Sequence, residues 1–364
     1  MPLRIGINAL YLIPGGVGGT EIYLRSLLAA LARVDTANQY VVYTNRETEA
    51  DLIPAAPNFL RVETPVRAVN RPARILYEQF VLPWRCRRER IDVCLNPGFT
   101  APMVAPCPQV TVIHDLQHKR HPEYFRWFDL PFWRLLVWGV VRRSARLIAV
   151  STATRDDLRR FYGVEHAAVV EHGVDDRFFA LAAQRTHVEP MVLCVSTLHP
   201  HKNIERLVRV FARLVARRPE LRMVLAGMKG FHTSPVEQLV ASLGIASRVD
   251  LTGWIPREEL YDYFRRAAVF VYPSTFEGFG MPVVEALAAG VPLACSNIDP
   301  LRGIAREAAW LFDPEDEAAM ERAIERLLQG DLPPGPNPAS EYSWTAAAHA
   351  TLRVLRSAAR HRSG

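Results

Sequence analysis

Short apolar runs alternate with segments of helical period along this chain, and the alternating pattern occurs twice. The runs in the first half are IGINAL, YVVYT, IDVCLNP, VTVIHD and RLIAVS. Those in the second half are VLCVST, MVLAG, VDLTG, VFVYPS and PLACS. Strands that are apolar throughout are buried on both faces, as in a parallel sheet covered by helices on each side. The sequence therefore predicts an α/β fold with two doubly wound parallel-sheet domains.

The boundary between the two predicted domains lies where the periodicity lapses, at residues 180–190. We place the N-terminal domain at residues 1–185 and the C-terminal domain at residues 186–344. The proline-rich stretch DLPPGPNPASEYSW predicts an extended connector before a last helix near residues 345–359. With 364 residues, 49% of them hydrophobic, the chain is long enough to bury two cores.

Composition excludes several classes of protein. The five cysteines are scattered without metal-ligand spacing, which favours reduced, buried thiols. No run approaches the roughly 18 apolar residues of a membrane span, and MPLRIGINAL begins with strand-like sequence instead of a signal peptide. We therefore expect a cytoplasmic protein. Residues 61–90 hold eight arginines and three glutamates, which predicts a positive surface in the first half and an acidic partner.

A glycine-rich loop, PGGVGGTE, follows the first predicted strand. Ligands of open parallel sheets bind at the carboxyl ends of strands, so this loop is a candidate binding segment. A dinucleotide fingerprint that starts at Gly16 needs a third glycine where Glu21 stands, and no acidic residue closes the next strand. The loop thus disfavours a nicotinamide dehydrogenase. Two interpretations stay open for Gly16, Gly18 and Gly19: a backbone cradle for an anionic or sugar ligand, and a plain tight turn.

The stretch PSTFEGFGMPVVEALAAGVPLACS places Glu277 and Glu285 eight positions apart around a second glycine-rich turn. Pro282 suits the first helical position and Gly290 suits a helix stop, so Glu285 is predicted in the first helical turn. The unpaired N–H groups and the dipole of a helix start favour an anion such as a phosphate. The alternative for each glutamate alone is structural: Glu285 complements the dipole, and Glu277 is a solvated loop residue.

Two basic side chains also follow predicted strands. His114 can hydrogen-bond a substrate hydroxyl, or it is a structural histidine held by the backbone. Lys202, in VSTLHPHKN, stands where an ammonium can pair with phosphates at the edge of the sheet, or it is a solvated lysine. A metal site at His114, His118 and His121 is disfavoured, because no cysteine or third ligand at helical spacing joins them. The chain has no Asp-x-Asp pair for a metal-bound diphosphate.

Together these segments resemble the retaining glycosyltransferases of family 4, which have the GT-B fold. FEGFGMPVVEALAAG, with its Glu-x7-Glu spacing, is the most specific element of the resemblance. TLHPHKN, the HD pair, the GGVGG loop, VVEHGVDDRFF and the late YSW occur in the order typical of that family. The resemblance covers nearly the whole chain. It implies two Rossmann-like domains facing across a cleft, a nucleotide-sugar bound by the C-terminal domain, and a last helix, residues 345–364, packed on the N-terminal domain.

The resemblance also implies a role for each matching residue. Glu277 would contact sugar hydroxyls, Lys202 the diphosphate and Glu285 the ribose, while His114 would reach the sugar from the N-terminal domain. The implied catalytic residues are Glu277, His114 and Lys202. The implied donor-binding residues are Gly278, Phe279, Gly280, Met281, Pro282, Glu285 and Ile255. The implied acceptor or phosphate loop consists of Gly16, Gly18 and Gly19.

The activity that the resemblance implies is transfer of a hexose to a glycan or lipid-linked saccharide in the synthesis of a cell-surface polysaccharide. Mannose from GDP-mannose is favoured over UDP-hexoses. Ser196 stands where many members have an arginine, which puts a second phosphate contact in question, and His172 stands where they have an asparagine. We expect neither a metal nor another cofactor, and no nucleic acid partner. The alternatives are a nucleotide-sugar epimerase and a non-catalytic nucleotide-sugar-binding protein.

Residues 126–143, RWFDLPFWRLLVWGVVRR, combine three tryptophans and two phenylalanines with four arginines. Pro131 is suited to begin a helix. A helix that is apolar on nearly every side is typically buried against its own sheet. Aromatic rings with basic flanks also suit the level of lipid headgroups. With the arginines of residues 61–90, this second interpretation predicts peripheral contact with the inner face of the membrane.

Overall fold

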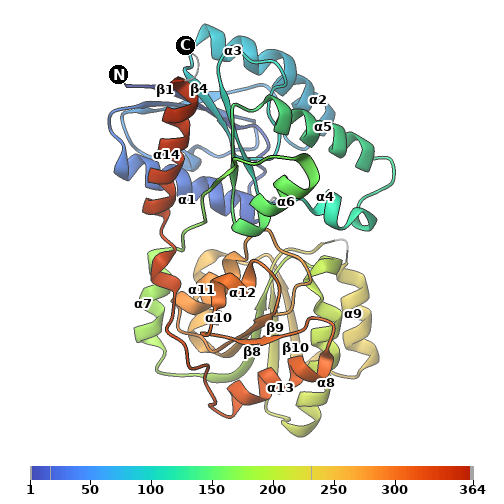
Figure 1. Ribbon diagram of the computed structural model, residues 1–364. Coiled ribbons are helices and arrows are strands. Elements are labelled where there is room, and N and C mark those ends of the chain that lie inside the picture. The colour runs from blue at the N-terminus through green and yellow to red at the C-terminus, as the bar shows by residue number, and fades with distance from the viewer. Residues whose placement is uncertain (1, 17, 231, 361–364) are drawn as a thin grey trace. The chain divides into compact units, whose positions relative to one another are not determined.

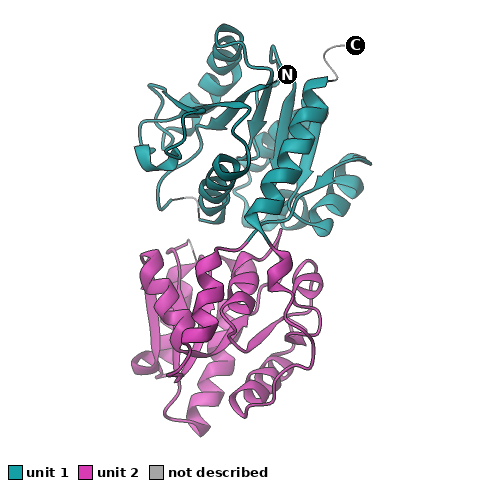
Figure 2. Ribbon diagram, turned by 90° about the vertical axis from the view of Figure 1, so that its left-hand side faces the viewer, with its two compact units in different colours: residues 1–173, 343–364 teal, residues 174–342 magenta. Residues whose placement is uncertain are grey.

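The computed structural model describes residues 2–16, 18–230 and 232–360. The chain divides into two compact units (Figure 2): unit 1 comprises Met1–Gly173 with Ser343–Gly364, and unit 2 comprises Val174–Tyr342. Each unit is a parallel sheet with helices packed against it (Figure 1), which confirms the predicted α/β fold with two doubly wound domains.

In the described part of unit 1, the sheet has seven strands in the order β3-β2-β1-β4-β5-β6-β7. The strands are β1 (Arg4–Ala9), β2 (Gln39–Thr44), β3 (Phe59–Glu63), β4 (Val93–Asn96), β5 (Gln109–Ile113), β6 (Arg146–Ala149) and β7 (Ala168–Val169). All neighbours are parallel, and central Ile5 pairs with Tyr40 on one side and Val93 on the other. The five strands predicted in this half are present, whereas β3 and β7 were not predicted.

The helices of unit 1 pack on this sheet. They are α1 (Gly19–Val34), η1 (Ala50–Leu52), α2 (Arg71–Leu76), the π-helix η2 (Tyr77–Val81), α3 (Leu82–Arg88), α4 (Gln117–Arg120), η3 (Pro122–Tyr124), α5 (Leu130–Arg143), α6 (Thr152–Tyr162) and α14 (Trp344–Arg360). The last helix, α14, packs on α1 and on strands β4, β5 and β6, and so belongs to unit 1. Gly173 touches its first residue, because a Cβ at Gly173 would lie 2.0 Å from Trp344 N.

The described part of unit 2 contains a six-stranded parallel sheet in the order β10-β9-β8-β11-β12-β13. The strands are β8 (Glu189–Val195), β9 (Arg222–Ala226), β10 (Val249–Gly253), β11 (Ala267–Tyr272), β12 (Leu293–Ser296) and β13 (Trp310–Phe312). The helices are α7 (Asp176–Gln184), η4 (Pro200–Lys202), α8 (Ile204–Arg217), α9 (Thr233–Ser242), η5 (Ala246–Arg248), α10 (Arg257–Arg266), α11 (Met281–Ala288), α12 (Leu301–Ala305), α13 (Glu317–Leu328) and η6 (Ala339–Glu341).

Helix α8 shows how the sequence builds the core of unit 2. Its apolar residues recur at helical spacing, and Leu207, Phe211 and Leu214 are at most 1% exposed. They pack with α9, α13 and strands β8, β9 and β11 in one apolar cluster. On the other side, α7 packs on α10 and α11. Because of that packing, α7 belongs to unit 2, and the division at Gly173 differs from the predicted boundary at residue 185.

Candidate active site

The turn between β11 and α11 carries the paired glutamates. Strand β11 ends at Tyr272, and α11 begins at Met281 with Pro282 in its first turn. Gly280 precedes the helix with φ of 111°, and a Cβ there would lie 2.4 Å from Leu301 Cδ2. Only glycine adopts this conformation without strain. The glycine thus allows a sharp entry into a helix whose dipole favours an anion at this end.

Glu285 is the fifth residue of α11, and no acidic residue occupies the first turn. The prediction that Glu285 lies in the first helical turn is therefore wrong, because the helix begins at Met281, one residue before the predicted start at Pro282. The residue is buried, with 5% of its surface exposed. Burial raises the pKa of its carboxyl group, and the charge of Arg257 opposes that rise.

Arg257 links Glu285 to a second carboxylate. It begins α10, and its Nη2 lies 3.4 Å from Glu285 Oε1 and 3.7 Å from Asp175 Oδ2. Tyr261 donates its hydroxyl hydrogen to Asp175 Oδ2 at 2.5 Å and accepts a hydrogen bond from Arg257 Nε at 3.0 Å. No role was predicted for Arg257, nor for Asp175 within the VVEHGVDDRFF segment. For Arg257 the signal was its position two residues after Ile255, which lies half-buried in the loop between β10 and α10.

Lys202 and Glu277 form an ion pair at the carboxyl edge of the sheet. Lys202 Nζ lies 2.6 Å from Glu277 Oε1 and donates to the Tyr272 hydroxyl at 3.2 Å. Only 14% of the lysine side chain and 9% of the glutamate side chain are exposed. Burial and the charge of Glu277 raise the pKa of Tyr272 well above its ordinary value, so its hydroxyl stays neutral. The structure thus brings two predicted catalytic residues into contact.

Backbone and amide hydrogen bonds hold the two loops of this pair together. Asn203, with φ of 58°, donates from Nδ2 to the carbonyl oxygens of Pro273 at 3.0 Å and Pro314 at 2.8 Å. Thr275 N donates to the carbonyl oxygen of His201 at 2.8 Å. Because β8 and β11 are neighbours in the sheet, these bonds fix Lys202 and its carboxylate partner to one edge.

The remaining predicted donor-binding residues lie along the same turn. Phe279 is 4% exposed, and its ring centroid lies 5.9 Å from that of Tyr342, so its side chain anchors the turn from inside. Gly278, Met281 and Pro282 are half-buried. Between Gly278 and Gly280 the turn therefore presents no exposed bulky side chain, next to the Lys202 pair and the start of α11.

His114 lies in unit 1, just after β5, and is 8% exposed. Its Nε2 donates a hydrogen bond to the carbonyl oxygen of Pro97 at 2.8 Å, because a carbonyl can only accept. Burial lowers the pKa of His114 to about 4. The ring is therefore neutral at physiological pH, and its Nδ1 is an acceptor. The ring also packs edge-on against Tyr23, with centroids 4.9 Å apart.

The glycine-rich loop after β1 is a braced turn. Gly18 has φ of 57° and precedes α1, and a Cβ at Gly16 would lie 2.7 Å from Ile13 Cγ2, so both positions favour glycine on steric grounds. Gly19 is the first residue of α1, and nothing lies within 4 Å of a Cβ built there. Glu21 Oε2 accepts a hydrogen bond from Gly15 N at 2.8 Å. Ligand binding by this loop stays a prediction.

The histidines near β5 are directed toward separate partners. His118 Nε2 lies 2.8 Å from the Tyr162 hydroxyl, and His121 Nδ1 lies 2.9 Å from Glu123 Oε1. Within residues 2–16, 18–230 and 232–360, no group of three or more His, Cys, Asp and Glu residues is arranged to hold a metal ion.

Comparison with known proteins shows the family. The family described as Glycosyl transferases group 1 matches residues 181–343, and Glycosyltransferase Family 4 matches residues 17–178. O-antigen chain mannosyltransferase B of Escherichia coli is 31% identical over 68% of this chain and 68% of its own length. The chain belongs to the group 1 glycosyltransferases. A further relative of this glycosyltransferase, the MMP alpha-(1->4)-mannosyltransferase of Mycolicibacterium hassiacum, is 31% identical over 66% of the chain and 63% of its own length.

Solved structures show that this glycosyltransferase has the GT-B fold. Sucrose-phosphate synthase from Thermosynechococcus elongatus superposes with a TM-score of 0.73 at 20% identity, over 99% of this chain and 97% of that chain. WaaG, a glycosyltransferase involved in lipopolysaccharide biosynthesis, superposes with a TM-score of 0.69 at 15% identity, over 98% of each chain. At these identities the comparison concerns the fold alone.

The two glutamates should affect different steps. In Glu277→Gln the ammonium of Lys202 loses its carboxylate partner and becomes available to phosphates, so nucleoside diphosphate affinity should be retained or increased while turnover falls at least about a hundredfold. In Glu285→Gln donor affinity should fall at least about tenfold, the expected loss for one charge-assisted hydrogen bond. Calorimetric titration and initial rates measure the two effects.

Glu220→Gln is the matched control, because Glu220 is an exposed glutamate of unit 2. It should leave affinity and turnover near those of the unchanged enzyme. Near-normal transfer in both Glu277→Gln and Glu285→Gln would contradict the assignment.

Proposed function

We propose that this glycosyltransferase transfers a mannosyl group from GDP-mannose, with retention of anomeric configuration, to a hydroxyl of a glycan or lipid-linked saccharide during synthesis of a cell-surface polysaccharide. The buried Lys202–Glu277 pair carries the proposal, since it places a cation for a diphosphate beside a carboxylate for sugar hydroxyls. Both relatives named above are mannosyltransferases, which favours mannose as the sugar.

The chemical step needs stabilisation of the leaving group. The bond between the anomeric carbon and the phosphate oxygen breaks, and its electron pair stays on the nucleoside diphosphate. Lys202 and the N-terminal end of α11 provide positive charge for that product before the reaction begins. The acceptor oxygen bonds to the anomeric carbon from the same face and gives its proton to the departing phosphate. No side chain has to form a covalent intermediate.

Two further groups would hold the donor in unit 2. Glu285 accepts hydrogen bonds from the ribose hydroxyls, and Arg257 favours the charged form of its carboxylate. The backbone of Gly278, Phe279 and Gly280 approaches the sugar and phosphates, because the turn exposes no bulky side chain there. In this proposal Ile255 and its neighbouring backbone lie beside the base.

His114 would contribute a neutral hydrogen-bond acceptor instead of a positive charge. Its Nε2–H is engaged by Pro97, and its pKa is lowered to about 4 by burial, so Nδ1 can accept from a sugar hydroxyl at neutral pH. The Gly16, Gly18 and Gly19 loop would bind acceptor or phosphate groups through its backbone.

We propose that the reaction requires no divalent metal, since a lysine and a helix N-terminus meet the diphosphate charge. Calorimetry and transfer assays test the function directly. In a thermal-shift panel of nucleotide-sugars, GDP-mannose should raise the unfolding temperature most. Transfer from it should continue in EDTA, and Lys202→Met should lower donor affinity at least about tenfold.

Lys229→Met is the matched control, because Lys229 is an exposed lysine of the same unit, with 66% of its side chain accessible. It should leave donor affinity unchanged. Loss of transfer in EDTA with recovery on adding Mg²⁺ would overturn the metal-free mechanism. A stronger shift with a UDP-hexose would overturn the choice of donor, and an epimerised nucleotide without transfer would overturn the function.

One surface of unit 1 favours peripheral membrane contact. Helix α5 buries one face against the sheet, including Leu136, Val137 and Val140. The interpretation that this helix is buried against its own sheet is confirmed for that face alone, because the other face is exposed. Its exposed apolar residues, with those just before it, are Trp127, Phe128, Phe132, Leu135 and Trp138, with exposures from 42% to 84%. No helix in the described ranges is both long enough and apolar enough to cross a bilayer.

Arginines lie among these aromatic rings. The Arg71 guanidinium sits 4.3 Å from the Trp133 ring centroid, and Arg142 and Trp138 form a similar pair at 5.9 Å. On α3, Arg88 lies 5.3 Å from the ring centroid of Trp84. Apolar rings with interleaved guanidinium groups suit an anionic lipid surface, so we propose that unit 1 contacts the inner face of the membrane peripherally.

Co-sedimentation with phosphatidylglycerol and phosphatidylcholine vesicles tests this contact. Binding should rise with the anionic fraction and fall with salt, because each surface arginine contributes about 1 kcal/mol. Changing Arg85, Arg87 and Arg88 to serine should weaken it roughly a hundredfold. The matched control changes Arg218, Arg222 and Arg248 of unit 2 to serine and should bind normally. Absence of binding at low salt with every lipid would favour a water-soluble acceptor.

A further inference from the structure

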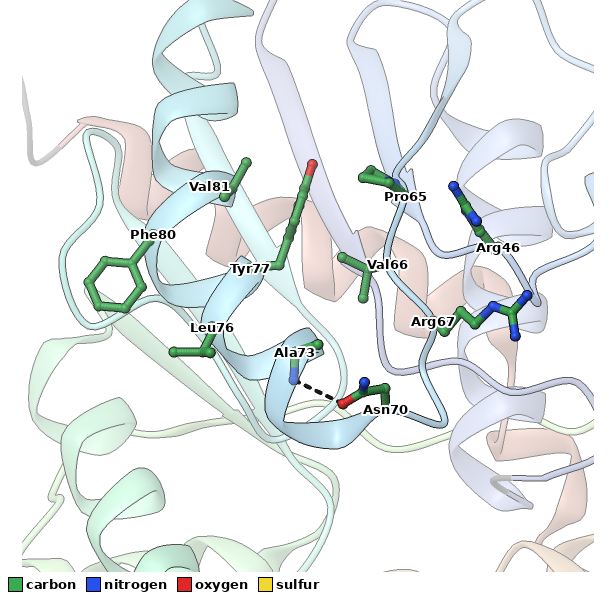
Figure 3. A pocket seen from close by; sticks show the side chains of 10 residues that line it. All are labelled: Arg46, Pro65, Val66, Arg67, Asn70, Ala73, Leu76, Tyr77, Phe80 and Val81. Atoms are coloured by element: carbon green, nitrogen blue, oxygen red, sulfur yellow. Dashed lines mark hydrogen bonds between the residues drawn. The ribbon is translucent and has the colours of Figure 1, made fainter.

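Unit 1 contains a pocket of about 690 Å³ that no role discussed so far uses. It lies between the segments that follow β2 and β3 and the helical stretch from α2 into η2 (Figure 3). Its lining residues are Arg46, Pro65, Val66, Arg67, Asn70, Ala73, Leu76, Tyr77, Phe80 and Val81. Arg46 comes two residues after β2, and Pro65 two residues after β3, so the pocket opens at the carboxyl edge of the sheet, where parallel sheets bind ligands.

Hydrogen bonds brace the walls of the pocket. Arg46 N donates to the carbonyl oxygen of Val66 at 2.9 Å, and Ala68 N donates to Glu47 Oε2 at 2.9 Å. Asn70 caps α2 by accepting from Ala73 N at 3.2 Å, as the dashed line in Figure 3 shows. The loop wall and the helical wall are therefore each fixed by local bonds.

The two walls differ in chemistry. Figure 3 shows Ala73 and Tyr77 on the helical wall and Val66 on the loop wall, whereas Phe80 points outward from the helix. Arg46 and Arg67 lie together on the loop side, both exposed. In the described part of the chain neither guanidinium forms a salt bridge. The pocket thus pairs apolar walls with positive charge that is available to an external anion.

The end of β2 also ties this pocket to the glycine-rich loop. Asn45 Nδ2 donates to the carbonyl oxygens of Leu10 at 2.9 Å and Leu12 at 2.6 Å, which lead from β1 toward Gly16. The residue next to Asn45 is Arg46, so one short segment supports both the loop proposed for the acceptor and the positive rim of the pocket. At the other side, Arg71 of α2 lies over Trp133 and connects this helix to the exposed surface of α5.

We infer that this pocket binds the lipid phosphate of the acceptor: Arg46 and Arg67 pair with the phosphate, and the apolar walls take the first part of its hydrocarbon chain. A free saccharide would leave those apolar walls uncovered, and an inorganic anion would need only the arginines. Both halves of the pocket are matched by an alkyl or isoprenoid phosphate. The inference rests on the proposed function in one respect, since it takes the acceptor to be lipid-linked.

Calorimetric titration of the full chain with decyl phosphate, below its micelle concentration and without donor, tests the inference. Decyl phosphate should bind at least about tenfold tighter than inorganic phosphate or a neutral decyl glucoside. Changing Arg46 and Arg67 together to serine should weaken it at least about tenfold. Ala73→Trp should also weaken decyl phosphate binding at least about tenfold, because the larger side chain fills the pocket. Ala73 is exposed, so this substitution does not disturb the core.

The matched control changes Arg353 and Arg356 of α14 to serine, which removes the same charge from exposed positions of unit 1 outside the pocket. It should bind decyl phosphate within about twofold of the unchanged chain. An equal loss in this control would overturn the inference in favour of diffuse charge attraction. Inorganic phosphate that binds as tightly as decyl phosphate would also overturn the inference and would indicate a simple anion site. Decyl glucoside that binds as tightly as decyl phosphate would overturn it too and would indicate an apolar groove.

Phosphatidylglycerol vesicles separate the acceptor from a membrane headgroup. We expect vesicle binding to fall more when Arg87 and Arg88 are changed to serine than when Arg46 and Arg67 are, and the reverse order would overturn the inference. Failure of the pocket is distinguishable from failure of the enzyme, because decyl phosphate binding is measured without transfer. Tight binding with no sugar transfer would overturn the proposed function alone, and transfer without binding would overturn the pocket alone.

Discussion

A nearly buried ion pair, Lys202 with Glu277, is the interaction on which the candidate site depends. Two charges withdrawn from water lose hydration, and each would be costly to leave alone, so the pair persists only while both partners are held in place. Asn203 provides that hold, because its amide bridges the loop after β8 to the loops at Pro273 and Pro314. A bound diphosphate would take the place of Glu277 beside Lys202. The Glu277 carboxylate, released from the ion pair, would then face the sugar.

The parallel sheet determines where such groups can meet. In each unit, the chain turns from strand to helix at the carboxyl edge, so side chains far apart in sequence come together there. Unit 2 places Lys202, the glycine-rich turn and the start of α11 on that edge. Glu285 is buried further along α11, where it forms an ion pair with Arg257. Unit 1 places the glycine loop, His114 and the pocket rim at Arg46 on its own edge. The donor site proposed in unit 2 and the acceptor site proposed in unit 1 thus use the same structural arrangement.

Much of this arrangement could be predicted from the sequence, and the failures have physical reasons. All ten predicted apolar runs became strands, whereas β3, β7 and β13 were missed. All three lie at an edge of their sheet, are at most five residues long and are mostly half-buried, so they form no long apolar run. The Glu-x7-Glu spacing located the turn, and Pro282 located the start of α11 to within one residue. Arg257 and Asp175 were missed because their contacts join distant segments, which no local pattern records. The two faces of α5 likewise depend on which neighbours pack against it.

The most direct test of the central claim is a crystal structure of the enzyme with GDP-mannose. We expect a diphosphate oxygen about 3 Å from Lys202 Nζ, mannose hydroxyls at the Glu277 carboxylate and ribose hydroxyls at Glu285. The phosphates should lie at the first turn of α11, and the Lys202–Glu277 contact of 2.6 Å should be lengthened or broken. A nucleotide bound elsewhere in unit 2, with that contact intact, would contradict the account.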